Sequence, residues 1–231
     1  MSTILVVAAH PDDEILGAGA TIASRVAAGD TAYAVILGEG QTSRADHRED
    51  MAASVIEELH KDTLNAAKHV GFTEVFFENV PDNRFDQMDL LDVVKKVEKL
   101  VKKLQPDVIY THHKGDLNID HRITYQAVLT ATRPMQNCPV KEIYTFETLS
   151  STEWNFAYGE NQFKPNVFVN VENTFTKKLD AMKEYRTELC EFPHPRSLKA
   201  LEVTAQKWGS VVGKEYVEPF ELVRNVVEFY K

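Results

Sequence analysis

The sequence predicts a three-layer α/β/α fold, in which a mainly parallel sheet is flanked by helices on both faces. Apolar strand-like runs alternate with helical patterns over residues 1–146, as in sheets built from right-handed strand–helix–strand crossovers. The first run, residues 3–9, is continuously apolar, as expected of a strand that is covered on both faces. The chain has 231 residues, of which 43% are hydrophobic. This suits one large Rossmann-like domain that spans residues 1–231.

The first elements follow one another closely. The strand at 3–9 is followed by a helical pattern over residues 15–28, which Gly29 closes. The run TAYAVILG (31–38) predicts a second buried strand that ends in a glycine-containing loop. A long helix is expected from about Arg48 to Val70, because Gly71 after it is a typical C-terminal cap.

The pattern then continues to the middle of the chain. EVFFENV (74–80) predicts a third strand, and PDNRFD (81–86) after it is a turn-forming loop. The clearest amphipathic helix covers residues 89–104, where apolar residues recur at three- and four-residue steps until Pro106. Further strands, helices and a closing segment are expected at residues 107–113 (strand), 121–132 (helix), 141–147 (strand), 166–171 (short strand), 176–186 and 197–209 (helices) and 218–230 (closing segment).

Composition and charge exclude several classes of protein. The formal net charge is −9, and acids and bases are mixed along the chain, so neither a nucleic-acid groove nor an anionic-membrane patch is expected. The two cysteines, Cys138 and Cys190, are far apart, which excludes a cysteine zinc knuckle and a disulfide scaffold and fits a reducing cytoplasm. No apolar run approaches the ~20 residues that span a bilayer, and no signal peptide is recognisable. We therefore expect a cytoplasmic protein.

Two polar clusters follow the ends of two predicted strands. AHPDDE (9–14) comes directly after the first strand, and HHKGDLNIDH (112–121) begins at the end of the fourth. In sheets of this kind, ligands bind beyond the carboxyl ends of the strands. We therefore expect the two clusters to meet at one rim of the sheet, although they lie about 100 residues apart.

The residue types in these clusters are those of a divalent metal site. Imidazoles and a carboxylate can bind Zn²⁺ and leave one position open for water. Metal binding lowers the pKa of that water to about 7, and a second carboxylate can then act as general base. Acidic residues in this position can also simply cap a helix. The candidate ligands are His10, Asp12, Asp13, Glu14, His112, His113, Asp116, Asp120 and His121.

The same two segments resemble a known family, the PIG-L/LmbE-like N-deacetylases. AHPDDE after an N-terminal strand and the later NIDH (118–121) carry the resemblance, which extends to EFPHPRS (191–197) and GSVVGKEYVEPFELVR (209–224). The resemblance implies a zinc hydrolase that acts on N-acetylated sugars or related amides. It places Zn²⁺, or another divalent metal, on His10, Asp13 and His121, with Asp12 as the general base.

One position departs from the family pattern. Many members have a histidine where this chain has Asn118, and an asparagine amide can donate a hydrogen bond to an oxyanion but cannot act as an acid. The proton for the leaving amine must then come from elsewhere. His194 is the first candidate, presented by a neighbouring subunit if the chain assembles as a trimer or hexamer, as some relatives do. His112 and His113 compete with it, and Asp120 is expected to orient a side chain of the site.

The partner implied by the resemblance is a small N-acetylated sugar or glycoconjugate. Arg84 and Asp86, in the loop after the third strand, could contact sugar hydroxyls, and Arg44 and Arg48 are weaker candidates in the loop after the second. All four can equally be turn or surface residues. A carbohydrate substrate follows from the resemblance alone and not from composition or spacing.

Three alternative functions remain in view. The first is an amidase on a non-sugar amide, such as a thiol conjugate. A nucleotide-binding module is suggested by GAGAT (17–21), but HPDDE occupies the turn where a dinucleotide fingerprint has its glycines, so these glycines are interpreted as sites of close helix–sheet packing. A metal-binding protein without catalysis would leave Asp12 as a surplus carboxylate.

Overall fold

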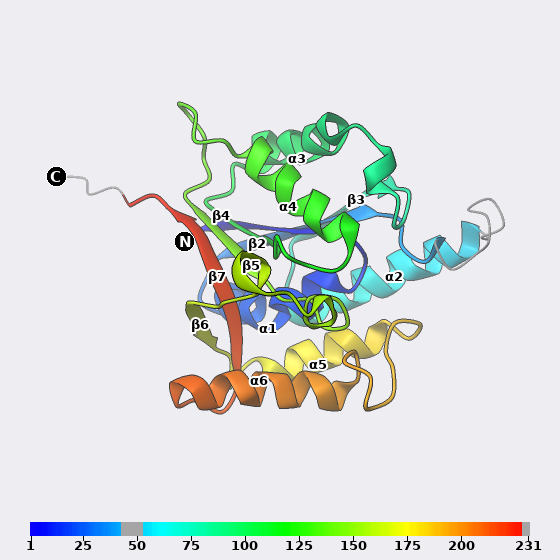
Figure 1. Cartoon of the computed structure of the whole chain (residues 1–231), viewed down its shortest axis with the longest axis vertical. Coiled ribbons are helices and arrows are strands. Elements are labelled where there is room, and N and C mark those ends of the chain that lie inside the picture. Colours follow the sequence, from blue (N-terminus) through cyan, green and yellow to red (C-terminus); the bar gives the residue numbers. More distant parts are fainter. Residues whose placement is uncertain (43–52, 228–231) are drawn as a thin grey trace.

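A seven-stranded sheet forms the middle layer of the protein (Figure 1). The computed structural model describes residues 1–42 and 53–227. The strands are β1 (Thr3–Ala8), β2 (Thr31–Gly38), β3 (Glu74–Val80), β4 (Val108–His112), β5 (Glu142–Phe146), β6 (Val167–Asn170) and β7 (Val217–Asn225). Their order is β3-β2-β1-β4-β5-β7-β6. The first five are parallel, whereas β7 is antiparallel to both β5 and β6.

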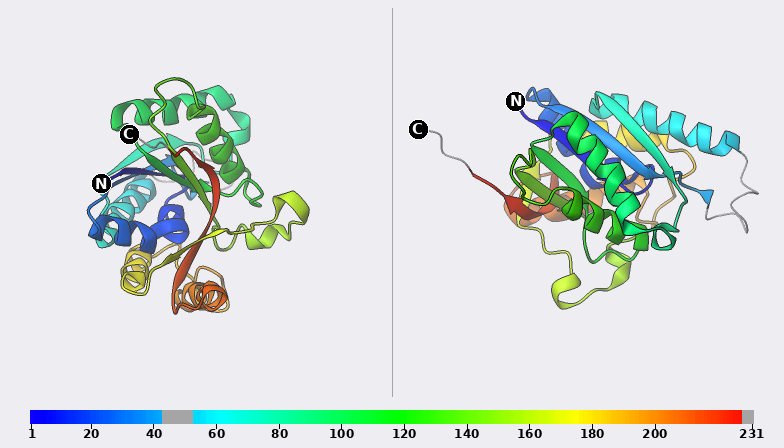
Figure 2. Two further views of the ribbon diagram at one scale, coloured as in Figure 1. Left: turned by 90° about the vertical axis from the view of Figure 1, so that its left-hand side faces the viewer. Right: turned by 90° about the horizontal axis from the view of Figure 1, so that it is seen from above.

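Helices cover both faces of this sheet, so the predicted three-layer α/β/α fold is confirmed (Figures 1 and 2). One face carries α3 (Leu90–Leu104) and α4 (Ile119–Ala131). The other carries α1 (Asp13–Ala27), α2 (Ala53–Val70), α5 (Phe175–Glu184) and α6 (Leu198–Val212). Short 3₁₀ helices lie in the connections: η3 (Phe85–Gln87), η4 (Glu153–Asn155) and η5 (Gly159–Asn161).

The central strand β1 explains why its sequence is apolar throughout. Leu5 and Val7 pack in the core beneath α3 and α4, whereas Ile4 and Val6 pack against α1, and all four are fully buried. Successive side chains of a strand point to opposite faces, so a strand buried on both faces needs apolar residues at every position.

Most element boundaries agree with the sequence patterns to within two or three residues. The strands β2 and β3 begin and end where predicted. The closing segment forms β7, which returns antiparallel to β5 and inserts before β6. This return follows directly from the end of α6, where Gly213 adopts a left-handed conformation (φ 72°) that glycine allows without steric cost.

The strand order places two chain segments together at the site. β1 is paired with β2 on one side and β4 on the other, and the connections from β1 and β4 leave to opposite faces of the sheet. A crevice opens at such a topological switch point, beyond the carboxyl ends of the strands. The two polar clusters of the sequence follow these two strand ends.

Gly17, in the first turns of α1, allows this helix to lie close to the sheet. A Cβ atom at this position would overlap the ring of Phe146 on β5, and Phe146 is itself fully buried. We expect Gly17→Ala to lower the free energy of unfolding by about 1–3 kcal/mol, because overpacking displaces buried side chains. Thermal denaturation measures the change.

Gly19→Ala is the matched control, because its Cβ would meet only Ile15 of the same helix at 3.1 Å and Lys178 at 3.5 Å. Helix propensity favours alanine over glycine, so this variant should lose little stability. Equal melting temperatures for the two variants would contradict the packing assignment.

Candidate metal centre and active site

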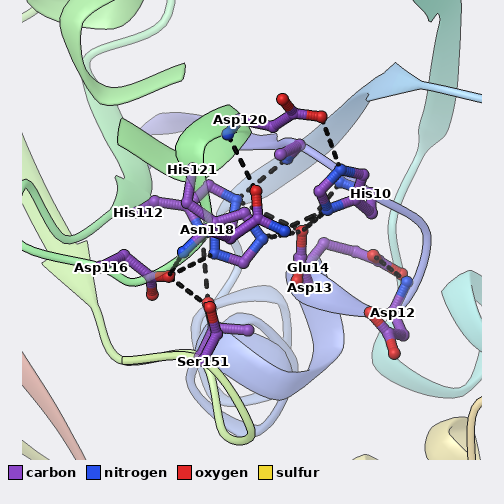
Figure 3. A network of polar contacts seen from close by, with 12 residues as sticks. His10, Asp12, Asp13, Glu14, His112, Asp116, Asn118, Asp120, His121 and Ser151 are labelled. Atoms are coloured by element: carbon purple, nitrogen blue, oxygen red, sulfur yellow. Dashed lines mark hydrogen bonds and ion pairs between the residues drawn. The ribbon is translucent and has the colours of Figure 1, made fainter. Parts of the chain in front are cut away.

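Three side chains from the two polar clusters meet at the rim of the sheet (Figure 3). His10 follows β1, Asp13 begins α1, and His121 lies in the first turn of α4. His10 Nδ1 lies 3.2 Å from His121 Nε2 and 3.4 Å from Asp13 Oδ2, and the latter two atoms are 3.3 Å apart. The predicted convergence of residues 10, 13 and 121 is therefore present in the structure.

The donor set and its spacing fit a tetrahedral divalent metal ion. Zinc–nitrogen and zinc–oxygen bonds of about 2.0–2.2 Å set neighbouring ligand atoms about 3.3–3.5 Å apart in a tetrahedron. The three observed separations of 3.2–3.4 Å have this size. Two imidazole nitrogens and one carboxylate oxygen are also the ligands of catalytic zinc sites, which keep a fourth position open.

Asp120 fixes the orientation of His10. Its Oδ2 lies 3.0 Å from His10 Nε2, and its Oδ1 accepts a hydrogen bond from the backbone N–H of Phe85. Asp120 is fully buried. A carboxylate at Nε2 holds the proton on that nitrogen and leaves Nδ1 free to bind a metal. This is the orienting role that the sequence suggested for Asp120.

Asp116 contacts His121 in the way that Asp120 contacts His10, at the imidazole nitrogen that points away from the candidate metal position. Its Oδ1 lies 3.1 Å from His121 Nδ1. Asp116 is held in turn by the hydroxyls of Ser151 and Thr152 and by the backbone N–H of Asn118. His121 Nε2 is thereby directed toward Asp13. Each imidazole of the candidate ligand set thus has a buried carboxylate on its far nitrogen.

The electrostatics of this cluster favour a cation. Burial acts to lower the pKa of both imidazoles, but the contacting carboxylates outweigh it: they hold the pKa of His10 well above its ordinary value and raise the pKa of His121 to about 9. Burial acts to raise the pKa of Asp13, but the charges of His121 and His112 and the hydrogen bonds with His10 and His112 together outweigh it and lower that pKa well below its usual range. A site whose field retains positive charge on its imidazoles also favours a metal cation.

A second group of possible ligands shares His10 with the first. His10 Nε2 lies 3.2 Å from Asp82 Oδ1 and 3.0 Å from Asp120 Oδ2. Binding a metal here would require removal of the Nε2 proton from an imidazole that two carboxylates contact. A metal held by Asp13 and His121 would instead use His10 Nδ1 and leave the Nε2 contact with Asp120 intact, so this group is the better candidate.

Asp12 lies beside the ligand set and occupies the N-cap position of α1, but its side chain does not cap the helix. Its backbone is left-handed (φ 99°), and its side chain makes no capping hydrogen bond to α1. The residue is 4% exposed and lines the cavity next to the candidate metal ligands. Burial and the negative charge of Asp13 raise the pKa of Asp12 well above its ordinary value, against the opposing charge of Arg196. A side-chain capping hydrogen bond therefore does not account for Asp12.

The cavity at this rim has a volume of about 210 Å³. Its lining includes the three candidate ligands, Asp12 and Asn118, together with further polar residues that include Asp82, Asn83, Ser150, Ser151, Glu188 and Arg196. Asn118 accepts a hydrogen bond from Asp120 N–H through Oδ1 and donates one to Asn83 Oδ1 through Nδ2. The N-cap bond fixes Oδ1 as the acceptor, so Nδ2 is the donor end of the amide, and both Asn118 and its partner Asn83 line the cavity.

Several predicted residues are not brought into this cavity. His194 does not line it: its Nδ1 accepts a hydrogen bond from Arg196 N–H, and its ring packs edge-on against Trp154. Arg84 and Asp86 are exposed beside η3 and do not line it either. Arg44 and Arg48 lie outside the described residues.

The two histidines that end β4 have other partners. His112 is fully buried; its Nε2 accepts a hydrogen bond from Ala9 N–H, and its Nδ1 lies 3.1 Å from Thr148 Oγ1. Burial, and then the positive charge of His121, lower the pKa of His112 to about 4. His113 contacts Glu221 and the backbone oxygen of Asn161 and does not line the cavity. Neither is placed to protonate a substrate in this cavity.

Sequence reasoning did not assign Asp82, Glu188 or Arg196 to the site, and it left Asp116 as one of several possible ligands. Asp82 stands two residues before Arg84 in PDNRFD, and Arg196 stands two after His194 in EFPHPRS. In both loops the side chain that lines the cavity stands two residues from the one named in the sequence analysis. Backbone turns decide which side chain points inward, and composition does not show this.

The role of Asp120 gives a direct test. We expect Asp120→Asn to weaken zinc binding about 10–100-fold, as loss of such a supporting partner does. An amide that keeps the bond from Phe85 N–H would present its NH₂ group to His10 Nε2, and two donors cannot bond. Competition with a chromophoric chelator measures the affinity. Asp86→Asn, at an exposed position on η3, is the control, and equal affinities for the two variants would exclude the assignment.

Within the described part of the chain, none of the helices has the length and apolar character that crossing a membrane requires.

Comparison with known proteins identifies the family. Residues 5–132 match the PIG-L family, described as GlcNAc-PI de-N-acetylase. The chain is 32% identical over 190 residues to the uncharacterized deacetylase YaiS of Escherichia coli K12. This alignment covers 80% of this chain and 90% of the relative. It is 26% identical over 212 residues to the probable N-acetyl-alpha-D-glucosaminyl L-malate deacetylase 2 of Bacillus cereus, with 89% and 93% covered.

Solved structures share the fold. The N,N'-diacetylchitobiose deacetylase of Pyrococcus horikoshii aligns with a TM-score of 0.75 at 19% identity over 96% of this chain and 84% of that one. GalB of Pseudomonas putida KT2440, a 4-carboxy-2-hydroxymuconate hydratase, aligns with a TM-score of 0.76 at 18% identity over the whole of both chains. Proteins with this fold therefore catalyse more than one reaction, so structural similarity alone does not identify the family. The sequence matches do: this chain belongs to the PIG-L family of de-N-acetylases.

Proposed function

We propose that this protein is a zinc-dependent N-deacetylase that removes the acetyl group from a neutral N-acetylated sugar or glycoconjugate. The observation that carries the proposal is the triangle of His10 Nδ1, Asp13 Oδ2 and His121 Nε2 beside the buried carboxylate of Asp12. Family membership supports the reaction, and the donor set supports zinc. Another divalent metal with the same ligand preference would be recognised by elemental analysis of the purified protein.

Asp12 is the proposed general base. When bound, the metal ion lowers the pKa of water to about 7 and polarises a carbonyl oxygen. Asp12 lines the cavity, and one of its oxygens is held by Arg196. The other can accept the proton of the water that attacks the acetamide carbonyl. General base catalysis of this kind contributes about 10²–10⁴-fold.

Asn118 is the proposed oxyanion donor. Its Oδ1 is occupied by Asp120 N–H, so its Nδ2 is the group available to the cavity. One N–H bonds to Asn83 Oδ1, and the other can donate to the oxygen that becomes negative as the carbonyl is attacked. Asn118 thus supplies the hydrogen bond of the missing histidine without its acidity.

Asp12 is also the proposed source of the proton for the leaving amine. His112 and His113 have other partners, and His194 does not line the cavity in this chain. The proton that Asp12 takes from water can pass to the amide nitrogen as the C–N bond breaks, which releases acetate and a free amine. The same carboxylate would thus serve as general base in the first step and, once protonated, as general acid in the second.

The size and lining of the cavity favour a substrate that is uncharged and of which only a small part, the acyl end, is enclosed. Its volume of about 210 Å³ is below the roughly 300–1,000 Å³ of pockets that enclose drug-sized ligands. Among the described lining residues, four carboxylates (Asp12, Asp13, Asp82 and Glu188) outnumber the single arginine, Arg196. A neutral N-acetylhexosamine suits this lining better than a carboxylate-bearing conjugate such as the one named for the Bacillus cereus relative.

The remaining proposals concern the cellular location and the oligomeric state of the enzyme. We propose that it acts in the cytoplasm and assembles as a homo-oligomer, a trimer or a hexamer. Light scattering gives the mass of the assembly directly.

Acetate release tests the function. The zinc-loaded protein is incubated with free, aryl-linked, malate-linked and nucleotide-linked N-acetylglucosamine and with an N-acetylated thiol conjugate, and acetate is measured enzymatically. We expect turnover of the neutral glycosides. Preferred turnover of the malate-linked or nucleotide-linked sugar would contradict the neutral substrate, turnover of the thiol conjugate alone would support the non-sugar amidase, and inactivity on every amide would reject the proposal.

A further inference from the structure

Arg196 reaches the site from a segment outside the part of the chain that matches the family. The match ends at residue 132, whereas Arg196 lies in the connection between α5 and α6. A hydrogen bond joins this connection to the cavity lining: Gln41 Nε2 donates to Glu188 Oε1 at 2.7 Å. Within the connection, Cys190 N–H donates to the backbone oxygen of Arg196, and Arg196 N–H donates to His194 Nδ1. The EFPHPRS segment thus holds Arg196 in place, and His194 is one of its supports.

The guanidinium of Arg196 bridges two acidic residues at the edge of the cavity. Its Nη1 donates to Asp12 Oδ2 at 3.2 Å and to Glu188 Oε2 at 2.7 Å. Within the described part of the chain, its Nε is buried without a hydrogen-bond partner. An unsatisfied buried donor costs about 1–3 kcal/mol, which offsets part of what the ion pair with Glu188 contributes to stability.

Asp12 depends on this contact for its orientation. Its side chain does not cap α1, and the Arg196 contact is the hydrogen bond that its carboxylate makes to the described residues. Asp12 Oδ2 is therefore engaged, and Oδ1 is the oxygen that remains for the cavity, which Asp12 lines. Without Arg196, no hydrogen bond to the described residues would fix the orientation of this carboxylate.

We infer that Arg196 is a positioning residue for Asp12: it holds Oδ2 so that Oδ1 faces the water that Asp12 deprotonates. The inference rests on the proposed function, because it assigns Arg196 a task in that reaction. It predicts that Arg196 acts on the chemical step and not on substrate binding, since misplacing a reacting group by about 1 Å costs roughly 10²-fold.

Steady-state kinetics of three variants test the inference. Arg196→Gln should lower kcat about 10²-fold and leave KM within about threefold, with the metal content unchanged. Arg196→Lys should have a kcat about tenfold above that of Arg196→Gln, because the lysine ammonium can donate to Asp12 but lacks the planar geometry of the guanidinium. Arg186→Gln is the matched control: Arg186, two residues after α5, pairs with Glu58 and Asp62 and does not line the cavity, so the kcat of this variant should equal that of the wild type.

A wild-type kcat for Arg196→Gln would overturn the inference. So would equal losses for Arg196→Gln and Arg186→Gln, which would show that the segment matters only as a structural unit. Crystal structures of the wild type and Arg196→Gln give a readout that needs no substrate. Rotation of the Asp12 carboxylate in the variant, with His10 and His121 in place, supports the inference, and an unmoved carboxylate contradicts it. Wild-type inactivity on all amides would reject the proposed function, and this structural comparison would still decide whether Arg196 positions Asp12.

Discussion

Replacing Asp12 by asparagine is expected to lower kcat about 10²–10⁴-fold and to leave one metal ion bound per chain. An amide has the same size as the carboxylate and can still accept the hydrogen bond from Arg196 Nη1, but it cannot take a proton from water. The candidate ligand atoms belong to other residues, with separations of 3.2–3.4 Å, so they are unaffected. Acetate release and metal analysis of the same preparation separate the two effects.

Asp86→Asn makes the same chemical change at an exposed position on η3 that does not line the cavity, so it should retain wild-type turnover. Wild-type turnover of Asp12→Asn would remove Asp12 as general base. Loss of the metal from that variant would instead make Asp12 a ligand, which is equally incompatible with the arrangement proposed here.

His121→Gln is expected to weaken metal binding more than about 100-fold, beyond the loss caused by removing a supporting residue, and to abolish acetate release. The substitution removes one of three ligand atoms and leaves Asp116 and Asp13 without the imidazole that both contact. The melting temperature should also fall, because buried carboxylates that lose their partner are destabilising. Isothermal titration with zinc and thermal denaturation measure both changes.

His69→Gln is the control for this experiment. His69 lies in α2, is partly exposed, and pairs with Glu184 at the surface. Surface pairs contribute at most about 1 kcal/mol, so zinc affinity should not change. Zinc binding by His121→Gln that equals that of His69→Gln would rule out His121 as a ligand.

The sequence predicted the sheet because its buried strands leave a strong signal. The β1 run is apolar at every position, and the helices α1 and α3 begin and end near recognisable cap or breaker residues. The position of β7 in the sheet was harder to predict. The closing segment alternates apolar and polar residues, but its antiparallel pairing with β5 depends on where α6 ends in space. That is a tertiary effect, which local patterns do not contain.

The same distinction separates the parts of the site. His10, Asp13 and His121 were predictable because they follow the ends of β1 and β4, and the strand order brings those ends together. Arg196 arrives from a loop 184 residues away from Asp12, and no periodicity marks its direction. His194, in the same loop, was predicted as the proton donor because Asn118 cannot act as an acid; in this chain its Nδ1 accepts a hydrogen bond from Arg196 N–H.

The central claim is that one cation lies between the two polar turns, and anomalous scattering tests it most directly. Crystals of the zinc-loaded protein, measured on both sides of the zinc absorption edge, should show one peak about 2.0–2.2 Å from each of His10 Nδ1, Asp13 Oδ2 and His121 Nε2. A peak on the other side of the imidazole, among His10 Nε2, Asp82 and Asp120, or no peak at this rim, would contradict the account.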